Sequence, residues 1–98
     1  MQTMNSILLF TLEGCRPCVL VKKQLERARD WEKYVTLVPA ENSELASKYH
    51  VSGFPTLVIL DPVRGWHKVV ERPEQLTKSY FETLFDTIDH NTNFSNDT

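Results

Sequence analysis

The sequence has few of the residues that mark specialised classes of protein. Its 98 residues include only two cysteines and three glycines, and its formal net charge is only −2. Two cysteines exclude a disulfide-rich secreted scaffold. The slightly acidic balance argues against a nucleic-acid-binding protein, which needs clustered excess lysine and arginine. Because no apolar run approaches the roughly 20 residues of a membrane span, we expect neither nucleic acid nor a membrane among the partners.

The first residues carry no lysine or arginine, and the apolar run that follows, Ile7 to Phe10, is short. A signal peptide needs a basic start and a longer apolar core. The sequence therefore predicts a cytoplasmic protein. In a reducing cytosol, two closely spaced cysteines suggest redox catalysis or metal binding more than a structural staple.

The chain has the size and composition of one globular domain. It is 41% hydrophobic and 24% charged, and a chain of this length supports one modest core. We expect a single domain over residues 1–98, with its core in about 5–89. Asn, Thr, Asp and Ser dominate residues 90–98, which predicts a polar, frayed tail.

Apolar spacing and turn residues predict an α/β fold in the order β-α-β-α-β-β-α. The expected elements are a strand at 5–12, a helix at 16–31, a strand at 34–38, a short helix at 42–50, strands at 56–60 and 66–70, and a helix at 73–88. The first helix fits a crossover between parallel strands, and the last two strands fit an antiparallel hairpin. The almost wholly apolar strand 56–60 is expected inside the sheet, with helices on both faces.

Both cysteines lie at the junction between the first strand and the first helix, in the run Gly14-Cys15-Arg16-Pro17-Cys18. Proline is tolerated in the first helical turn. At the start of a helix, the unpaired backbone N–H groups and the positive end of the helix dipole favour the thiolate form of a cysteine over the thiol. Arg16, a permanent charge between the sulfurs, and Pro17 are expected to tune the acidity of Cys15. The alternative for Arg16 is a side chain in water whose charge is screened.

A metal site is the alternative for the two cysteines. Zinc takes four ligands, the sequence has no further cysteine, and His50, His67 and His90 follow no ligand spacing. We therefore expect no bound metal.

The element order, with Cys-x-x-Cys after the first strand and Gly53-Phe54-Pro55-Thr56 before the third, resembles the thioredoxin superfamily. The resemblance implies a thioredoxin fold with a four-stranded mixed sheet, and a cis peptide bond at Pro55, beside the dithiol. It also implies a protein-disulfide reductase in which Cys15 is the nucleophile, Cys18 resolves the mixed disulfide, and the two form a redox-active disulfide. Gly14, Phe54 and Pro55 would then form the substrate-docking surface.

The resemblance further implies a monomer that needs no cofactor of its own, takes protein disulfides as substrates and is recharged by thioredoxin reductase. The sequence departs from the family in lacking the first strand and helix of full thioredoxins. Gly14 stands where the family carries Trp, and Leu9 stands where it carries a buried acid. Two alternatives remain open: a glutaredoxin-like enzyme that uses glutathione, and a redox-silent binding module.

Overall fold

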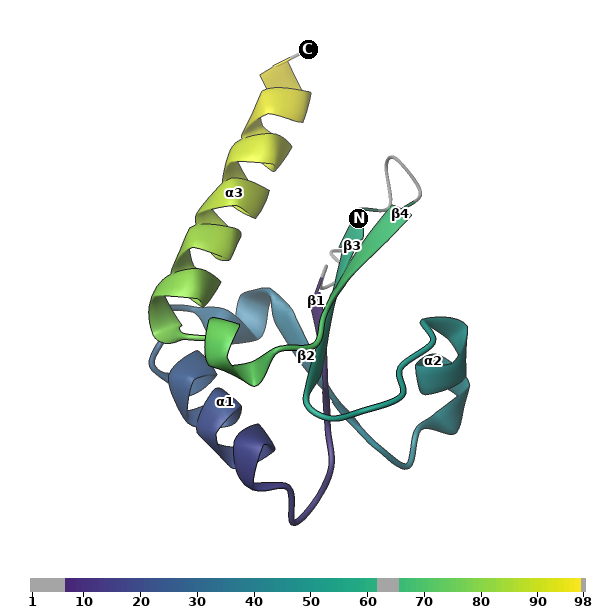
Figure 1. Cartoon of the computed structure of the whole chain (residues 1–98). Helices are drawn as coiled ribbons and strands as arrows, with labels where there is room; N and C mark the ends of the chain where they lie inside the picture. The colour runs from purple at the N-terminus through teal and green to yellow at the C-terminus, as the bar shows by residue number, and fades with distance from the viewer. Residues whose placement is uncertain (1–6, 62–65, 98) are drawn as a thin grey trace.

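The computed structural model describes residues 7–61 and 66–97. They form a four-stranded sheet with helices on both faces (Figure 1). The elements are β1 (Ile7–Thr11), α1 (Arg16–Glu26), η1 (Trp31–Lys33), β2 (Val35–Pro39), α2 (Ser43–Lys48), β3 (Thr56–Asp61), β4 (Trp66–Val70), η2 (Pro73–Gln75) and α3 (Lys78–Asp97), where η marks a short 3-10 helix. The predicted order of strands and longer helices is confirmed.

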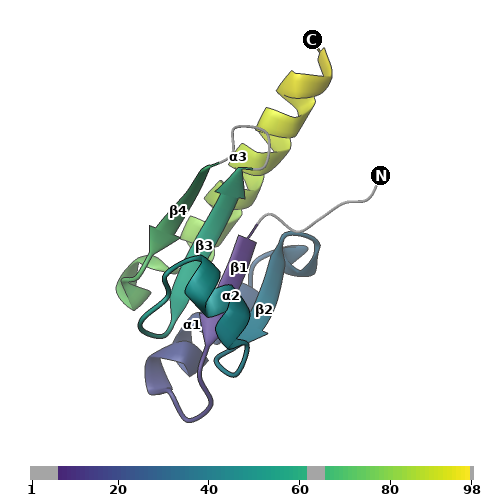
Figure 2. The ribbon, with the colours of Figure 1, turned by 90° about the vertical axis from the view of Figure 1, so that its right-hand side faces the viewer.

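The strands lie in the order β2-β1-β3-β4. β1 pairs in parallel with β2 and antiparallel with β3, and β3 pairs antiparallel with β4. Figure 2 shows these strands side by side, with α2 in front of them. The predicted mixed sheet, the crossover through α1, the hairpin and the interior position of the apolar strand β3 are all confirmed.

α1 and α3 cover one face of the sheet and enclose the larger core (Figure 1). Successive strand residues point to opposite faces, so Ile7 and Leu9 of β1 belong to this core while Phe10 belongs to the other. The buried members of the larger core are Ile7, Leu9, Val21, Leu25, Ala28, Val35, Leu57, Ile59, Val70, Leu76, Phe81 and Phe85. Each large side chain buried here stabilises the fold by about 1.5–3 kcal/mol. The helix that follows the first cysteine is thereby fixed to the sheet.

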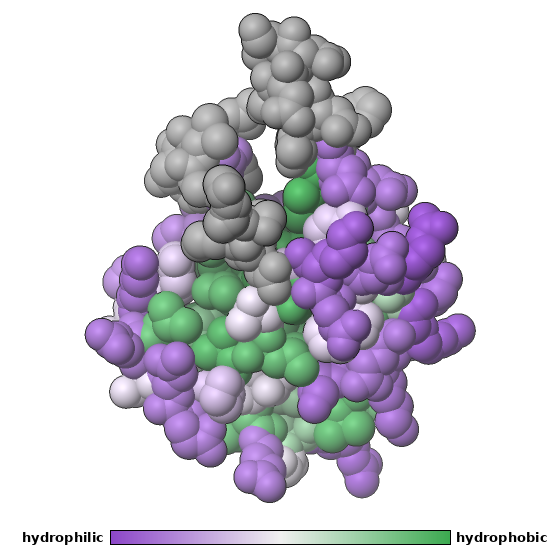
Figure 3. Space-filling model, turned by 180° about the vertical axis from the view of Figure 1, so that it is seen from behind, coloured by the Kyte–Doolittle hydropathy of each residue, from purple (hydrophilic) through white to green (hydrophobic). Residues whose placement is uncertain are grey.

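The opposite face carries a smaller core of Phe10, Val38 and Val58, against which α2 packs. The side chain of Asn42 caps α2 by accepting a hydrogen bond from the Leu45 N–H at 3.2 Å, as its polar side chain predicts. From behind, apolar side chains gather across the middle of the molecule between hydrophilic flanks (Figure 3). Both faces of the sheet therefore carry an apolar core, but on this face Leu8, Leu60 and Val69 stay only partly buried.

Two predicted boundaries near the cysteines are wrong. Leu12 does not continue β1, because it enters the turn before Cys15. The first helix was expected to reach Trp31, but α1 ends at Glu26. Asp30 adopts a left-handed conformation with φ of 60°, which breaks the helical path, and Trp31 begins η1 instead. Residues 5 and 6 of the expected strand and the turn residues 62–65 lie outside the described part of the chain.

The last helix also differs from its prediction at both ends. Pro73 opens η2, and α3 begins only at Lys78. The Thr77 hydroxyl accepts a hydrogen bond from the Tyr80 N–H at 3.2 Å, in the manner of an N-cap. The expected frayed tail is helical as far as Asp97, because no glycine or proline interrupts the stretch that starts at Lys78. None of the described helices is long and apolar enough to cross a membrane.

Candidate active site at the cysteine pair

A tight turn after β1 places Cys15. The Cys15 N–H donates to the Leu12 carbonyl at 3.1 Å, and Gly14 has a φ of +82°. This is the glycine position of a type II turn. A Cβ on Gly14 would meet nothing within 4 Å, so backbone conformation rather than space calls for glycine. The turn thus gives a physical reason for Gly14 where the resemblance leads one to expect Trp.

Cys15 is the N-cap of α1, and Cys18 lies in the first turn of that helix. The Cys18 N–H donates to the Cys15 Sγ at 3.2 Å. The two residues are joined as a disulfide with a Cα–Cα distance of 5.2 Å. Cys15 is partly exposed, whereas Cys18 is only 2% exposed. In the dithiol form, the donated N–H and the helix dipole favour a thiolate at Cys15, the sulfur that a partner can reach.

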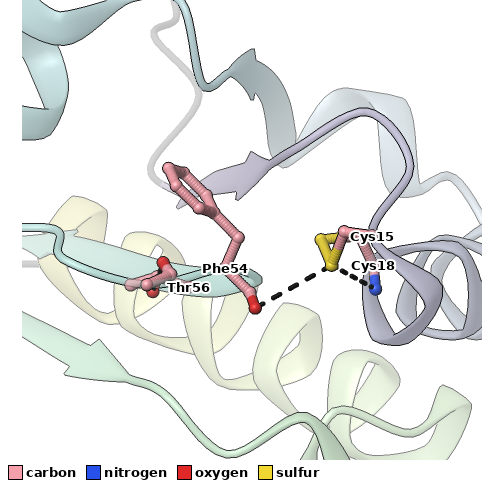
Figure 4. The surroundings of a disulfide bond; sticks show 5 residues. Cys15, Cys18, Phe54 and Thr56 are labelled. Carbon is pink, nitrogen blue, oxygen red and sulfur yellow. Dashed lines mark hydrogen bonds between the residues drawn. A yellow bond between two sulfur atoms is a disulfide. The ribbon is translucent and has the colours of Figure 1, made fainter.

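The turn before β3 faces the cysteines. The Phe54–Pro55 peptide bond is cis, which confirms that expectation. The Phe54 carbonyl oxygen lies 3.9 Å from the Cys15 Sγ (Figure 4). A protonated Cys15 can donate its S–H to this oxygen, whereas the thiolate cannot. The Thr56 hydroxyl donates to the Gly53 carbonyl at 2.6 Å and closes the turn.

The side chains of Phe54 and Pro55 do not form an apolar surface beside the sulfurs. The Phe54 ring packs against the smaller core and points away from the sulfurs (Figure 4). Pro55 is fully buried. What this turn offers a partner beside Cys15 is therefore the main chain of Phe54. The docking role of Gly14, Phe54 and Pro55 stays a prediction.

The remaining predicted residues divide between the interior and the surface. Leu9 is 0% exposed within the larger core, so no carboxylate occupies that position behind the cysteines. Arg16 and Pro17 are exposed on the first turn of α1, where solvent screens the Arg16 charge. In the described part of the chain, no group of three or more His, Cys, Asp or Glu side chains could hold a metal ion.

Sequence reasoning missed an exposed apolar group beside the cysteines. Leu12, Val19 and Leu20 are 46%, 49% and 58% exposed, and among the described side chains they are the large hydrophobic residues that solvent reaches most. The helical spacing of Leu20, Val21, Leu25, Ala28 and Trp31 predicts that Leu20 faces the sheet, and this prediction is wrong. The signal was present in Val19-Leu20-Val21, because three consecutive helical residues cannot all face the sheet.

No family model matches the sequence, and no curated protein matches it by sequence. Solved structures do match. A malarial protein aligns with a TM-score of 0.61 at 17% identity, over 83% of this chain and 92% of its own. A thioredoxin from Trypanosoma brucei brucei gives a TM-score of 0.60 at 28% identity, over 85% of this chain and 74% of its own. A thioredoxin from Thermus thermophilus aligns with a TM-score of 0.56 at 22% identity, over 84% of this chain and 71% of its own.

The chain is therefore a thioredoxin-like protein with a dithiol motif. The fold and the adjacent cysteine pair together support a thiol-disulfide oxidoreductase in general terms.

Proposed function

We propose that the protein reduces disulfide bonds in partner proteins. The observation that carries the proposal is the asymmetry of the two sulfurs. The reachable Cys15 Sγ accepts a hydrogen bond from the Cys18 N–H at 3.2 Å, while Cys18 is 2% exposed and three positions further along. An accessible, stabilised thiolate suits attack on a partner, and a buried neighbour suits the second step.

The reaction proceeds by two thiol-disulfide exchanges. The Cys15 thiolate attacks one sulfur of the partner disulfide, so that a mixed disulfide forms and the second partner sulfur leaves as a thiolate that takes up a proton. Cys18 loses its proton and attacks the Cys15 Sγ, which releases the first partner sulfur as a thiol. Two electrons and two protons pass to the partner, and the Cys15–Cys18 disulfide remains.

Regeneration requires an external reductant. We propose a flavin-dependent thioredoxin reductase as the electron donor, acting on a monomer in the cytoplasm. The resemblance to thioredoxins and the solved thioredoxins with the same fold support this donor. Glutathione as the donor is the competing proposal.

Insulin reduction by dithiothreitol tests the proposal, with the wild type, Cys15→Ser and Cys18→Ser compared side by side. The wild type should accelerate precipitation of the insulin B chain and Cys15→Ser should not. Reduced Cys18→Ser, freed of dithiothreitol and then mixed with insulin, should accumulate a mixed disulfide visible on a non-reducing gel. Turnover with glutathione alone as reductant would favour the glutathione-linked enzyme. A folded wild type that gives no acceleration in either assay would refute the proposal in favour of a binding module.

A further inference from the structure

A groove lies beside the cysteine pair, between α1 and η2. Its volume is about 630 Å³, and its apolar lining comes from Pro17, Leu20, Val21, Pro73 and Leu76. Pro17 stands between the two cysteines in the chain, so the groove begins at the site of the proposed chemistry. Leu20 is 58% exposed, the largest exposed fraction among the exposed large hydrophobic residues described.

Two cations border this groove. Lys23 and Arg27 line it, and both are exposed. Neither forms an ion pair with another described residue. Glu74 is the acidic residue among those that line the groove. An apolar lining with unpaired cations at its border is complementary to an apolar side chain flanked by carboxylates.

The positive charge is local to α1 and the turn that follows it and is not a property of the whole chain. The stretch from Arg16 to Arg29 contains five lysines and arginines and one acid, Glu26, for a local charge of +4. Because the whole chain carries −2, the rest of it carries −6. An acidic partner is therefore attracted to the side of α1 and repelled from the remainder, which orients its approach toward the cysteines.

We infer that the groove between α1 and η2 binds a segment of the partner protein in which a large apolar side chain is flanked by Asp or Glu. The inference rests on the proposed function, because the segment that binds the groove belongs to the protein whose disulfide is reduced and lies near that disulfide. The apolar side chain enters between Leu20 and Pro73, and the carboxylates meet Lys23 and Arg27.

A binding measurement tests the groove apart from the chemistry. The protein carrying Cys15→Ser and Cys18→Ser is titrated into a fluorescent peptide with one leucine among glutamates, and anisotropy is recorded. Binding should be about ten-fold tighter than for the same peptide with lysines in place of glutamates. Replacing the peptide leucine with serine should weaken it. Equal binding of the glutamate and lysine peptides would overturn the inference.

Charge-reversed variants locate the binding. Lys23→Glu with Arg27→Glu should abolish the preference for glutamate, and Leu20→Ser should weaken binding without loss of fold, because that side chain is already exposed. The matched control is Lys33→Glu with Lys48→Glu, the same charge change at exposed residues that do not line the groove. Equal loss in the control would overturn the inference. So would dimers in sedimentation velocity that disappear on reversal of Lys23 and Arg27, because the occupant would then be a second copy of the chain.

Kinetics separates this inference from the proposed function. The wild-type dithiol is mixed with neutral 2-hydroxyethyl disulfide or with a disulfide-linked form of the glutamate peptide. If the protein reduces neither disulfide, the proposed function is refuted. The anisotropy measurement then still tests whether the groove binds the acidic, apolar segment. A disulfide-linked form of the lysine peptide is the comparison. If both peptide disulfides are reduced at the same rate, the groove inference is refuted and the proposed function stands.

Discussion

Gly14 carries the change of direction between β1 and the cysteine-bearing helix. Its φ of +82° is in the left-handed region, where a side chain costs about 1–2 kcal/mol. Gly14→Ala should therefore lower the free energy of unfolding by about 1 kcal/mol, measured by urea denaturation. Gly53→Ala is the matched control, because a Cβ there also meets nothing within 4 Å and its φ lies outside that region. Equal stability of the two variants would contradict this account of the turn.

Tyr34 links the start of β2 to the last helix. Its hydroxyl donates to the Asp89 carboxylate at 2.6 Å, and its ring stacks on Phe85 with a centroid distance of 4.4 Å. The hydrogen bond to Asp89 raises the pKa of Tyr34 from 10.0 to about 12, because the hydroxyl can donate this bond and the phenolate, which has lost the proton, cannot. The folded state therefore holds this proton more tightly than the unfolded chain does. The resulting stability is complete below pH 10 and is lost as the pH rises toward 12.

Tyr34→Phe keeps the stacked ring and removes only the hydroxyl. We expect this variant to be less stable than the wild type by about 0.5 kcal/mol at neutral pH, the low end for a hydrogen bond because the pair is exposed. The difference should shrink as the pH rises from 10 toward 12. Urea denaturation of both proteins across this range provides the measurement. A difference that stays constant through pH 12 would show that the bond does not control the titration.

At the scale of elements, the first backbone N–H of α3 donates a hydrogen bond to a side chain of another helix. The side-chain oxygen of Gln24, on α1, accepts from the backbone N–H of Lys78 at 2.8 Å. A free N–H at a helix start costs stability when it is partly buried. Gln24→Ala should thus lower the unfolding free energy by about 1 kcal/mol, whereas Gln24→Glu, which keeps an acceptor, should lose less. Equal losses in urea denaturation would argue against this bond.

The lengths of the elements show where sequence reasoning stops. The strands and their order follow from apolar runs broken by Pro, Gly and Asp. The end of α1 does not follow, because after Glu26 the Arg27 and Ala28 N–H groups bond to carbonyls three residues back, and no glycine or proline marks this change in the sequence. Similarly, the rotation of α1 that exposes Leu20 and buries Val21 is set by contacts with the sheet and α3. The cysteine pair and the cis bond at Pro55 could be predicted because each has a local sequence motif, whereas the groove joins segments far apart in the chain.

At the scale of the whole molecule, the long last helix sets the shape. The principal extents are 45 × 28 × 21 Å, and α3 runs well past the end of the sheet in Figure 1. The interactions described for α3 extend to Ile88, at the edge of the larger core, and to Asp89, which bonds Tyr34.

Deletion of residues 91–98 tests how much this extension matters. It should change the free energy of unfolding by less than about 0.5 kcal/mol, as expected for surface changes remote from a core. Thermal unfolding followed by circular dichroism would measure the effect. A truncated protein that melts several degrees earlier would show that the extension supports the domain.

From the unequal burial of the two sulfurs we also expect a particular reaction of the dithiol form with peroxide. Peroxide reaches the partly exposed Cys15 and converts its thiolate to a sulfenic acid, whereas Cys18, at 2% exposure, is shielded. The Cys18 thiol then condenses with the sulfenic acid, water leaves, and the product is the Cys15–Cys18 disulfide already described. Oxidative injury to Cys15 is in this way diverted from the irreversible sulfinic acid into a repairable state.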